Sequence, residues 1–170
     1  MLQTPGLPLR ILTKITRPPG VSARRHREWM RAAFFAQGNH WQQQILPSRF
    51  VAGTSYPRKK RTEKYLRQKL NAARRGKAIL GGLVDNVYTG FLRDKLTAPA
   101  SIRAFPTRVT VRMVGPRYIG MRVYQSNQPD KAKELLWVSA AEQKKLREVL
   151  RDEYKRQHDR EPPATETHST

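Results

Sequence analysis

The chain has no cysteine among its 170 residues. This absence excludes disulfides, thiolate nucleophiles and cysteine-ligated zinc. No apolar run reaches the roughly 18 residues that a membrane-spanning helix needs, so no contact with a membrane is predicted. The first residues lack a charged segment followed by a clean apolar stretch, so a secretory signal is not expected.

Catalytic and nucleotide-binding patterns are also missing. The four histidines are scattered without metal-ligand spacing, and neither a GxxxxGK[ST] loop nor a GxGxxG after a strand is present. Asp130, Glu142 and Lys144 imitate the layout of metal-dependent nucleases, but that layout normally places its E-x-K on a strand. Here Glu142 is expected in a capped helix. We therefore predict no catalytic, metal or cofactor site, and no enzyme.

Acidic residues are few, at 13 against 34 basic ones, and the formal net charge is +21. The excess is concentrated: residues 1–80 carry 18 basic and 2 acidic side chains, whereas residues 134–170 carry 7 and 8. Self-repulsion opposes folding of such a front half unless it meets a negative surface. Nucleic acid, bound through counterion release, is one such surface, and an acidic protein wall is the other.

The sequence predicts an α+β fold, with a small antiparallel β-sheet flanked by helices and an extended basic N-terminal arm. Residues 1–20 form this arm, because four prolines and two glycines oppose regular structure; a disordered tail is the alternative reading of the same residues. Residues 21–158 form a single α+β domain. Residues 159–170 are polar and include two prolines, so a disordered tail is expected.

Two basic helices are predicted in the front half. Ser22 caps a helix over residues 23–37, which Gly38 is expected to break. Thr62 caps a second helix, which begins at residue 63 and which Gly76 stops.

The second half has mixed elements. Ser139 and Glu142 form a capping box at the start of the last helix. Residues 91–96 are expected to be a short helix or turn. Residues 107–114 alternate as a half-buried strand, and they are predicted to pair with a strand over residues 118–123. Residues 101–104 are a further candidate strand.

The predicted interaction residues are cations and one aromatic. In the stretch from residue 58 to residue 77 only Glu63 is acidic, so ion pairs within the helix cannot neutralise it. Tyrosines beside the cations are available to stack on bases. The residues predicted to face a partner or nucleic acid are Arg24, Arg25, Arg27, Arg31, Tyr56, Arg58, Lys59, Lys60, Arg61, Lys64, Arg67, Arg74 and Arg75.

One segment resembles a known family. Val87-Tyr-Thr-Gly-Phe-Leu-Arg93 is similar to the TG-x-LR segment of the tail-completion, or neck (head–tail joining), proteins of tailed bacteriophages. A basic, tyrosine-containing segment precedes it at residues 56–65, and a β-rich stretch follows at residues 102–124. Pro129-Asp130 and Ser139-x-x-Glu142 continue the order. The resemblance covers about residues 40–155.

The resemblance implies a virion structural protein without catalysis. Such proteins form a homo-oligomeric ring between portal or adaptor proteins of the head and tail-tube or tail-terminator proteins, with DNA in the lumen. They are assembled in the host cytoplasm. Thr89, Gly90, Leu92 and Arg93 would be structural, with Gly90 at an unusual backbone angle and Leu92 in the core. The ring could form between basic residues 1–80 and near-neutral residues 134–160, which include Glu148, Asp152 and Glu153.

A second function stays open at this stage. A ribosomal or other structural RNA-binding protein would also combine a basic arm with a small α+β body, at an isoelectric point near 11.2. The aromatic signature of RNA-recognition sheets is missing from residues 107–114, which weighs against a base-reading sheet of that type.

Overall fold

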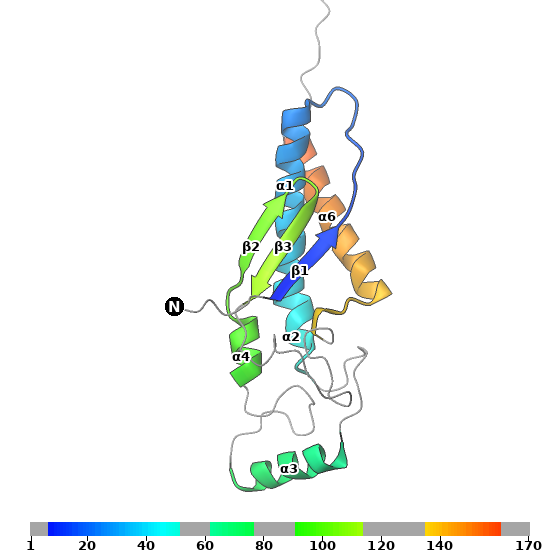
Figure 1. The fold of residues 1–170 in the computed structure, drawn as a ribbon. Helices are drawn as coiled ribbons and strands as arrows, with labels where there is room; N and C mark the ends of the chain where they lie inside the picture. Colours follow the sequence, from blue (N-terminus) through cyan, green and yellow to red (C-terminus); the bar gives the residue numbers. More distant parts are fainter. Residues whose placement is uncertain (1–6, 52–61, 77–90, 114–134, 161–170) are drawn as a thin grey trace, which may run out of the picture.

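The computed structural model describes residues 7–51, 62–76, 91–113 and 135–160 (Figure 1). The fold is α+β, as predicted. Its helices and strands, in chain order, are β1 (Leu7–Leu12), α1 (Ala23–His40), the π-helical turn η1 (Trp41–Ile45), α2 (Leu46–Ser48), α3 (Glu63–Arg74), α4 (Phe91–Thr97), β2 (Ser101–Phe105), β3 (Arg108–Met113) and α6 (Ala140–Arg160).

Helix α1 is the centre of the fold. Its first turn is capped as predicted, because the hydroxyl of Ser22 accepts a hydrogen bond from the backbone N–H of Arg25 at 3.2 Å. Its buried side chains recur at helical spacing and form one continuous stripe. They are Trp29, Met30, Ala33, Phe34 and Gln37. Through this stripe and its flanks α1 packs against both the sheet and α6.

The predicted break at Gly38 is wrong, since α1 continues to His40 and η1 follows without interruption. Gly38 is needed for packing. A Cβ atom built on it would lie 2.7 Å from Val109 Cγ2 and 3.3 Å from Val111 Cγ2. The missing side chain therefore lets the helix backbone approach the sheet closely, and burial in that contact outweighs the low helix propensity of glycine.

The sheet has three antiparallel strands in the order β1-β3-β2. The predicted alternation of β3 is confirmed, because Val109, Val111 and Met113 are buried while Arg108 and Arg112 are exposed. The predicted pairing of β3 with residues 118–123 is wrong, since β1 and β2 occupy both sides of β3. Residues 118–123 themselves lie outside the described part of the chain.

An extended arm without regular structure was predicted at residues 1–20. Within it, Leu7–Leu12 form the regular strand β1. The segment pairs with β3 along its whole length, with Pro8 opposite Arg112. An edge strand tolerates proline because one side of its backbone has no ladder partner to lose. Residues 13–22 then lead to α1 without helix or strand, with Gly20 at a φ of 74°.

The capping box of α6 is present as predicted. The N–H of Ser139 donates to Glu142 Oε2 at 2.8 Å, and the N–H of Glu142 donates to Ser139 Oγ at 3.1 Å. Leu146, Leu150 and Tyr154 bury the face that meets α1. The helix ends at Arg160, so Asp159 and Arg160, assigned to the disordered tail from sequence, are helical.

Two shorter helices complete the described structure. Helix α3 begins as predicted, with Thr62 Oγ1 accepting from the N–H of Tyr65 at 3.3 Å, and Gly76 follows its end at a φ of 65°. Helix α4 confirms the short helix expected at residues 91–96, and it buries Leu96 completely. The side chain of Gln42 ties the following turn to η1 by donating to the carbonyl of Ala98 at 2.9 Å.

Candidate interaction surface

The predicted cations of α1 lie on its exposed side. Arg24, Arg25, Arg27 and Arg31 are all exposed. Arg24 pairs with Glu28 at 3.1 Å, but both side chains face solvent, so this pair contributes little to stability. Glu28 is the one acidic residue of this helix, and its carboxylate cannot neutralise the remaining three arginines.

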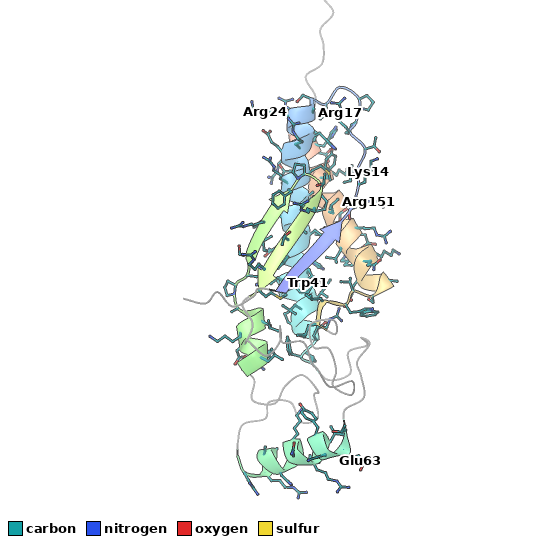
Figure 2. The ribbon with its side chains drawn as sticks, in the orientation of Figure 1. Lys14, Arg17, Arg24, Trp41, Glu63 and Arg151 are labelled. Carbon is teal, nitrogen blue, oxygen red and sulfur yellow. The ribbon has the colours of Figure 1, made fainter. Side chains whose placement is uncertain are left out.

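The predicted cations of α3 are exposed as well. Lys64, Arg67, Arg74 and Arg75 face solvent, and Arg67 pairs with Glu63 at 3.5 Å. In contrast, Lys69 of the same helix is 1% exposed. The α1 and α3 cations do not form one patch: Figure 2 shows Arg24 at the end of the molecule where α1 begins and Glu63 at the opposite end.

Several predicted site residues lie outside the described part of the chain. They are Tyr56, Arg58, Lys59, Lys60, Arg61, Thr89 and Gly90. Leu92, the next residue of the same motif, packs against the hydrophobic core. Arg93 pairs with Asp94 at 2.8 Å, and its carbonyl accepts a hydrogen bond from Thr97 at 2.8 Å, so it is held within α4.

The structure adds a cationic surface that the sequence analysis missed, here named the outer sheet face. It is the side of β2 and β3 that points away from α1, and no described helix covers it in Figure 1. Its residues are Ser101, Arg103, Phe105, Arg108, Thr110 and Arg112, which line a hollow of about 160 Å³. Neither strand contains an acidic residue. The alternation in residues 107–114 already separated Arg112 from the buried valines and could have revealed this face.

An aromatic ring belongs to the same face. Phe105 is 40% exposed although it is apolar. The guanidinium of Arg108 lies over its ring, 4.8 Å from the centroid, in a cation–π arrangement. The contact holds the charge of Arg108 at the surface and leaves part of the ring open to a ligand.

The charges of α6 are arranged differently. This helix also carries many cations, but acidic residues are interspersed among them. Lys145 pairs with Glu148 at 3.6 Å, and Arg156 pairs with Glu153. The outer surface of α6 therefore neutralises part of its own charge, whereas the arginines of the outer sheet face form no ion pair with any described residue.

Glu142, a member of the nuclease-like layout, already has partners. Arg49, itself 1% exposed, donates to Glu142 Oε2 and to the carbonyl of Trp137, both at 2.7 Å. Burial alone would raise the pKa of Glu142, but hydrogen bonds from Arg49 and Ser139 and the charge of Arg49 outweigh it and hold the pKa below its ordinary value. Asp130, the other carboxylate of that layout, lies outside the described residues.

A polar contact joins the two long helices. His26 Nδ1 and the hydroxyl of Tyr154 are hydrogen-bonded at 2.8 Å, and the ring of Trp29 meets Tyr154 edge-on. Burial and, to a smaller extent, the charge of Arg17 lower the pKa of His26. Burial and then the charge of Lys145 lower the pKa of His40 in the same way. Both histidines are therefore uncharged near neutral pH.

Within the described residues, no group of three or more histidine or carboxylate side chains could hold a metal ion. No helix in the same ranges has the length and apolar character to cross a membrane. No protein-family model, curated protein or solved structure matches this chain.

Proposed function

We propose that this chain is a non-catalytic structural protein of a phage neck. It would be one subunit of a homo-oligomeric ring that joins the portal or adaptor proteins of the head to the tail-tube or tail-terminator proteins. The observation that carries the proposal is the number of exposed cations on α1 and on the outer sheet face that have no acidic partner among the described residues. Charge of this kind is neutralised by a large anionic assembly, such as an acidic protein ring or packaged DNA.

The architecture agrees with the proposal. A small antiparallel sheet packed on helices is the fold that the family resemblance implies, and it is the fold of this chain. Leu92 of the resembling segment packs against the core, which fits a structural role for that segment.

The ion pairs of α6 indicate which acidic residue is available for the proposed contact between neighbouring subunits. Of the three acidic residues expected to meet a basic neighbour, Glu148 and Glu153 are already paired within the helix. Asp152 is exposed and makes no ion pair within the described residues. Asp152→Lys is therefore expected to weaken ring formation more than Glu148→Lys does. Unchanged ring formation by light scattering in both variants would contradict this contact.

Localisation in particles tests the function itself. The full chain would carry a C-terminal label, and purified particles would be viewed by negative-stain electron microscopy. We expect the label at the junction of head and tail, in one ring per particle. Label on ribosomes would overturn the neck assignment and establish the second candidate.

That second candidate is a structural RNA-binding protein, and one observation favours it. An exposed aromatic ring flanked by arginines on an antiparallel sheet is suited to single-stranded nucleic acid, because the ring stacks on a base while the cations meet phosphates. Phe105 with Arg108 has this geometry. The charge of α1 fits RNA and an acidic protein ring equally well.

A further inference from the structure

We propose that the outer sheet face binds the phosphate backbone of a nucleic acid. The proposal goes beyond the neck assignment and does not depend on it, since the surface would act in the same way on DNA in a conduit or on structured RNA. It assigns the contact to three arginines that composition alone did not single out, Arg103, Arg108 and Arg112.

The register of the strands places these arginines close together. Arg103 lies opposite Thr110 on the neighbouring strand, so Arg108 and Arg112 are its two diagonal neighbours. Diagonal neighbours on one face of an antiparallel pair are about 7–8 Å apart. This backbone spacing is close to the screening length of about 8 Å at physiological salt, so Arg103 repels both Arg108 and Arg112 unless an anion lies between them.

No anion of the chain fills that place in the described structure. All three arginines are exposed, and none of them forms an ion pair within the described ranges. The other cationic surfaces differ in this respect, because α1 and α6 each include carboxylates that pair with a neighbouring cation. Among the cationic surfaces of the described residues, the outer sheet face is the one whose arginines have no carboxylate partner, so an external anion is expected to bind there most favourably.

The size and chemistry of the hollow indicate which anion. Its volume of about 160 Å³ is below the roughly 300–1,000 Å³ of pockets that enclose a whole small molecule. It suits one charged group of a longer polymer. Arginine presents a planar fork of donors that matches phosphate oxygens, and the hydroxyls of Ser101 and Thr110, which also line the hollow, can add hydrogen bonds.

Phe105 adds a means of telling two nucleic acids apart. Its exposed ring can stack on an unpaired base, whereas the paired bases of a duplex are not available for stacking. The arginines should serve both forms, and the ring should favour the single strand. Comparison of the affinities for single-stranded and duplex nucleic acid therefore shows what Phe105 adds to the phosphate contact.

Fluorescence anisotropy with the full chain tests the proposal, using labelled single-stranded and duplex oligonucleotides over a range of salt concentrations. The variant Arg103→Gln/Arg108→Gln/Arg112→Gln removes the three charges. We expect at least about a tenfold loss of affinity at moderate salt. The slope of log affinity against log salt should fall by about 2–3, because each phosphate contact contributes about 0.7 for a single strand and 0.9 for a duplex.

Two further variants separate this surface from general charge and from misfolding. Arg147→Gln/Arg151→Gln/Lys155→Gln removes the same net charge from exposed positions of α6 and is expected to keep most of the affinity and the slope. Arg103→Lys/Arg108→Lys/Arg112→Lys keeps the charge of the sheet and should keep most of the slope. Circular dichroism confirms that each variant is folded.

These measurements test nucleic-acid binding by the outer sheet face and do not depend on whether the protein belongs to a phage neck. Wild-type affinity in the sheet glutamine variant, or equal losses in the sheet and α6 glutamine variants, would overturn the proposal. The proposal would also be overturned if the same arginines bound polyglutamate but not nucleic acid. That result would indicate that the outer sheet face binds an acidic protein. A selective loss of single-strand affinity in Phe105→Leu would support the proposal and show base stacking. Equal affinities of Phe105→Leu and wild type for both forms would support a phosphate-only contact, provided that the arginine variant weakens binding.

Discussion

The two sides of the β2–β3 pair are built from alternate residues of the same short strands, yet their surroundings are opposite. On the covered side, Val109, Val111 and Met113 are buried, in part against α1. On the outer side, three arginines face solvent, and none of them pairs with a carboxylate in the described ranges of the chain. A strand of six residues thus contributes hydrophobic burial in one direction and concentrated charge in the other. Stability and binding should therefore be separable by mutation.

The strongest test of this separation uses two adjacent residues on opposite sides. Met113→Ala should lower the free energy of unfolding by about 2–5 kcal/mol, because it removes a buried side chain and leaves a cavity. Arg112→Ala should change it by no more than about 0.5 kcal/mol, since its side chain is exposed. Urea unfolding measures both. Similar losses in the two variants would mean that the outer face is also structural.

A buried and an exposed arginine give the next largest contrast. Arg49→Met removes the hydrogen bonds to Glu142 and Trp137 and should cost about 1.5–3 kcal/mol, the range for charge-assisted hydrogen bonds. Arg103→Met should cost no more than about 0.5 kcal/mol. A loss in Arg103→Met as large as that in Arg49→Met would contradict the contrast.

The Arg49 contact also predicts a pH dependence. Because the pKa of Glu142 is lowered in the folded protein, its contribution is present above the ordinary value of 4.5 and is lost as pH falls through the lowered value. The wild type should therefore lose more stability below about pH 4.5 than Arg49→Met does. Parallel stability curves for the two proteins over that range would show that the contact is not linked to protonation.

A larger side chain at Gly38 of α1 should separate the helix from the covered side of the β2–β3 pair. Gly38→Val introduces atoms where a Cβ alone would approach Val109 to 2.7 Å, and overpacking of this kind costs about 1–3 kcal/mol. Thr110→Val introduces the same side chain on the outer side and should change stability by no more than about 0.5 kcal/mol. Adding Val109→Ala to Gly38→Val should recover part of the loss, and strictly additive losses would exclude direct contact.

The smallest expected effect concerns the contact between α1 and α6 that supports the covered side from behind. Tyr154→Phe removes the hydroxyl bonded to His26 and should cost about 0.5–1.5 kcal/mol. The same contact predicts a pH dependence. The pKa of His26 is lowered on folding, so the stability that the uncharged imidazole contributes is present above pH 6.5 and is lost as pH falls through the lowered value. His26→Gln should therefore lose less stability than the wild type below pH 6.5. Equal losses in the two proteins would show that protonation of His26 does not affect stability.

Local signals were enough to predict much of the fold. Ser22, Thr62 and the Ser139–Glu142 pair satisfy backbone N–H groups of their own helices, so their roles depend on neighbours in sequence. The alternation of β3 likewise indicated which residues are buried. Gly38 was misread because its role depends on Val109, which lies 71 residues away in sequence and comes close only in the folded chain.

The candidate surface was predicted only in part, for a related reason. The cations of α1 and α3 stand out as runs in the sequence, but Arg103 and Arg112 are separated by eight residues and become neighbours only across a strand pair. Strand pairing also escaped prediction, because the partner that completes the sheet comes from the N-terminal residues. Proline content argued against regular structure there, although an edge position makes Pro8 acceptable.

That N-terminal strand has a practical consequence for anyone who shortens the chain. A version beginning at residue 13 would look like the removal of a flexible leader, but it would strip β3 of one of its two neighbours. The newly uncovered row of amide and carbonyl groups would be open to pairing with other molecules, and exposed edges of this kind promote aggregation. A shortened chain intended for crystallisation should therefore keep residues 7–12.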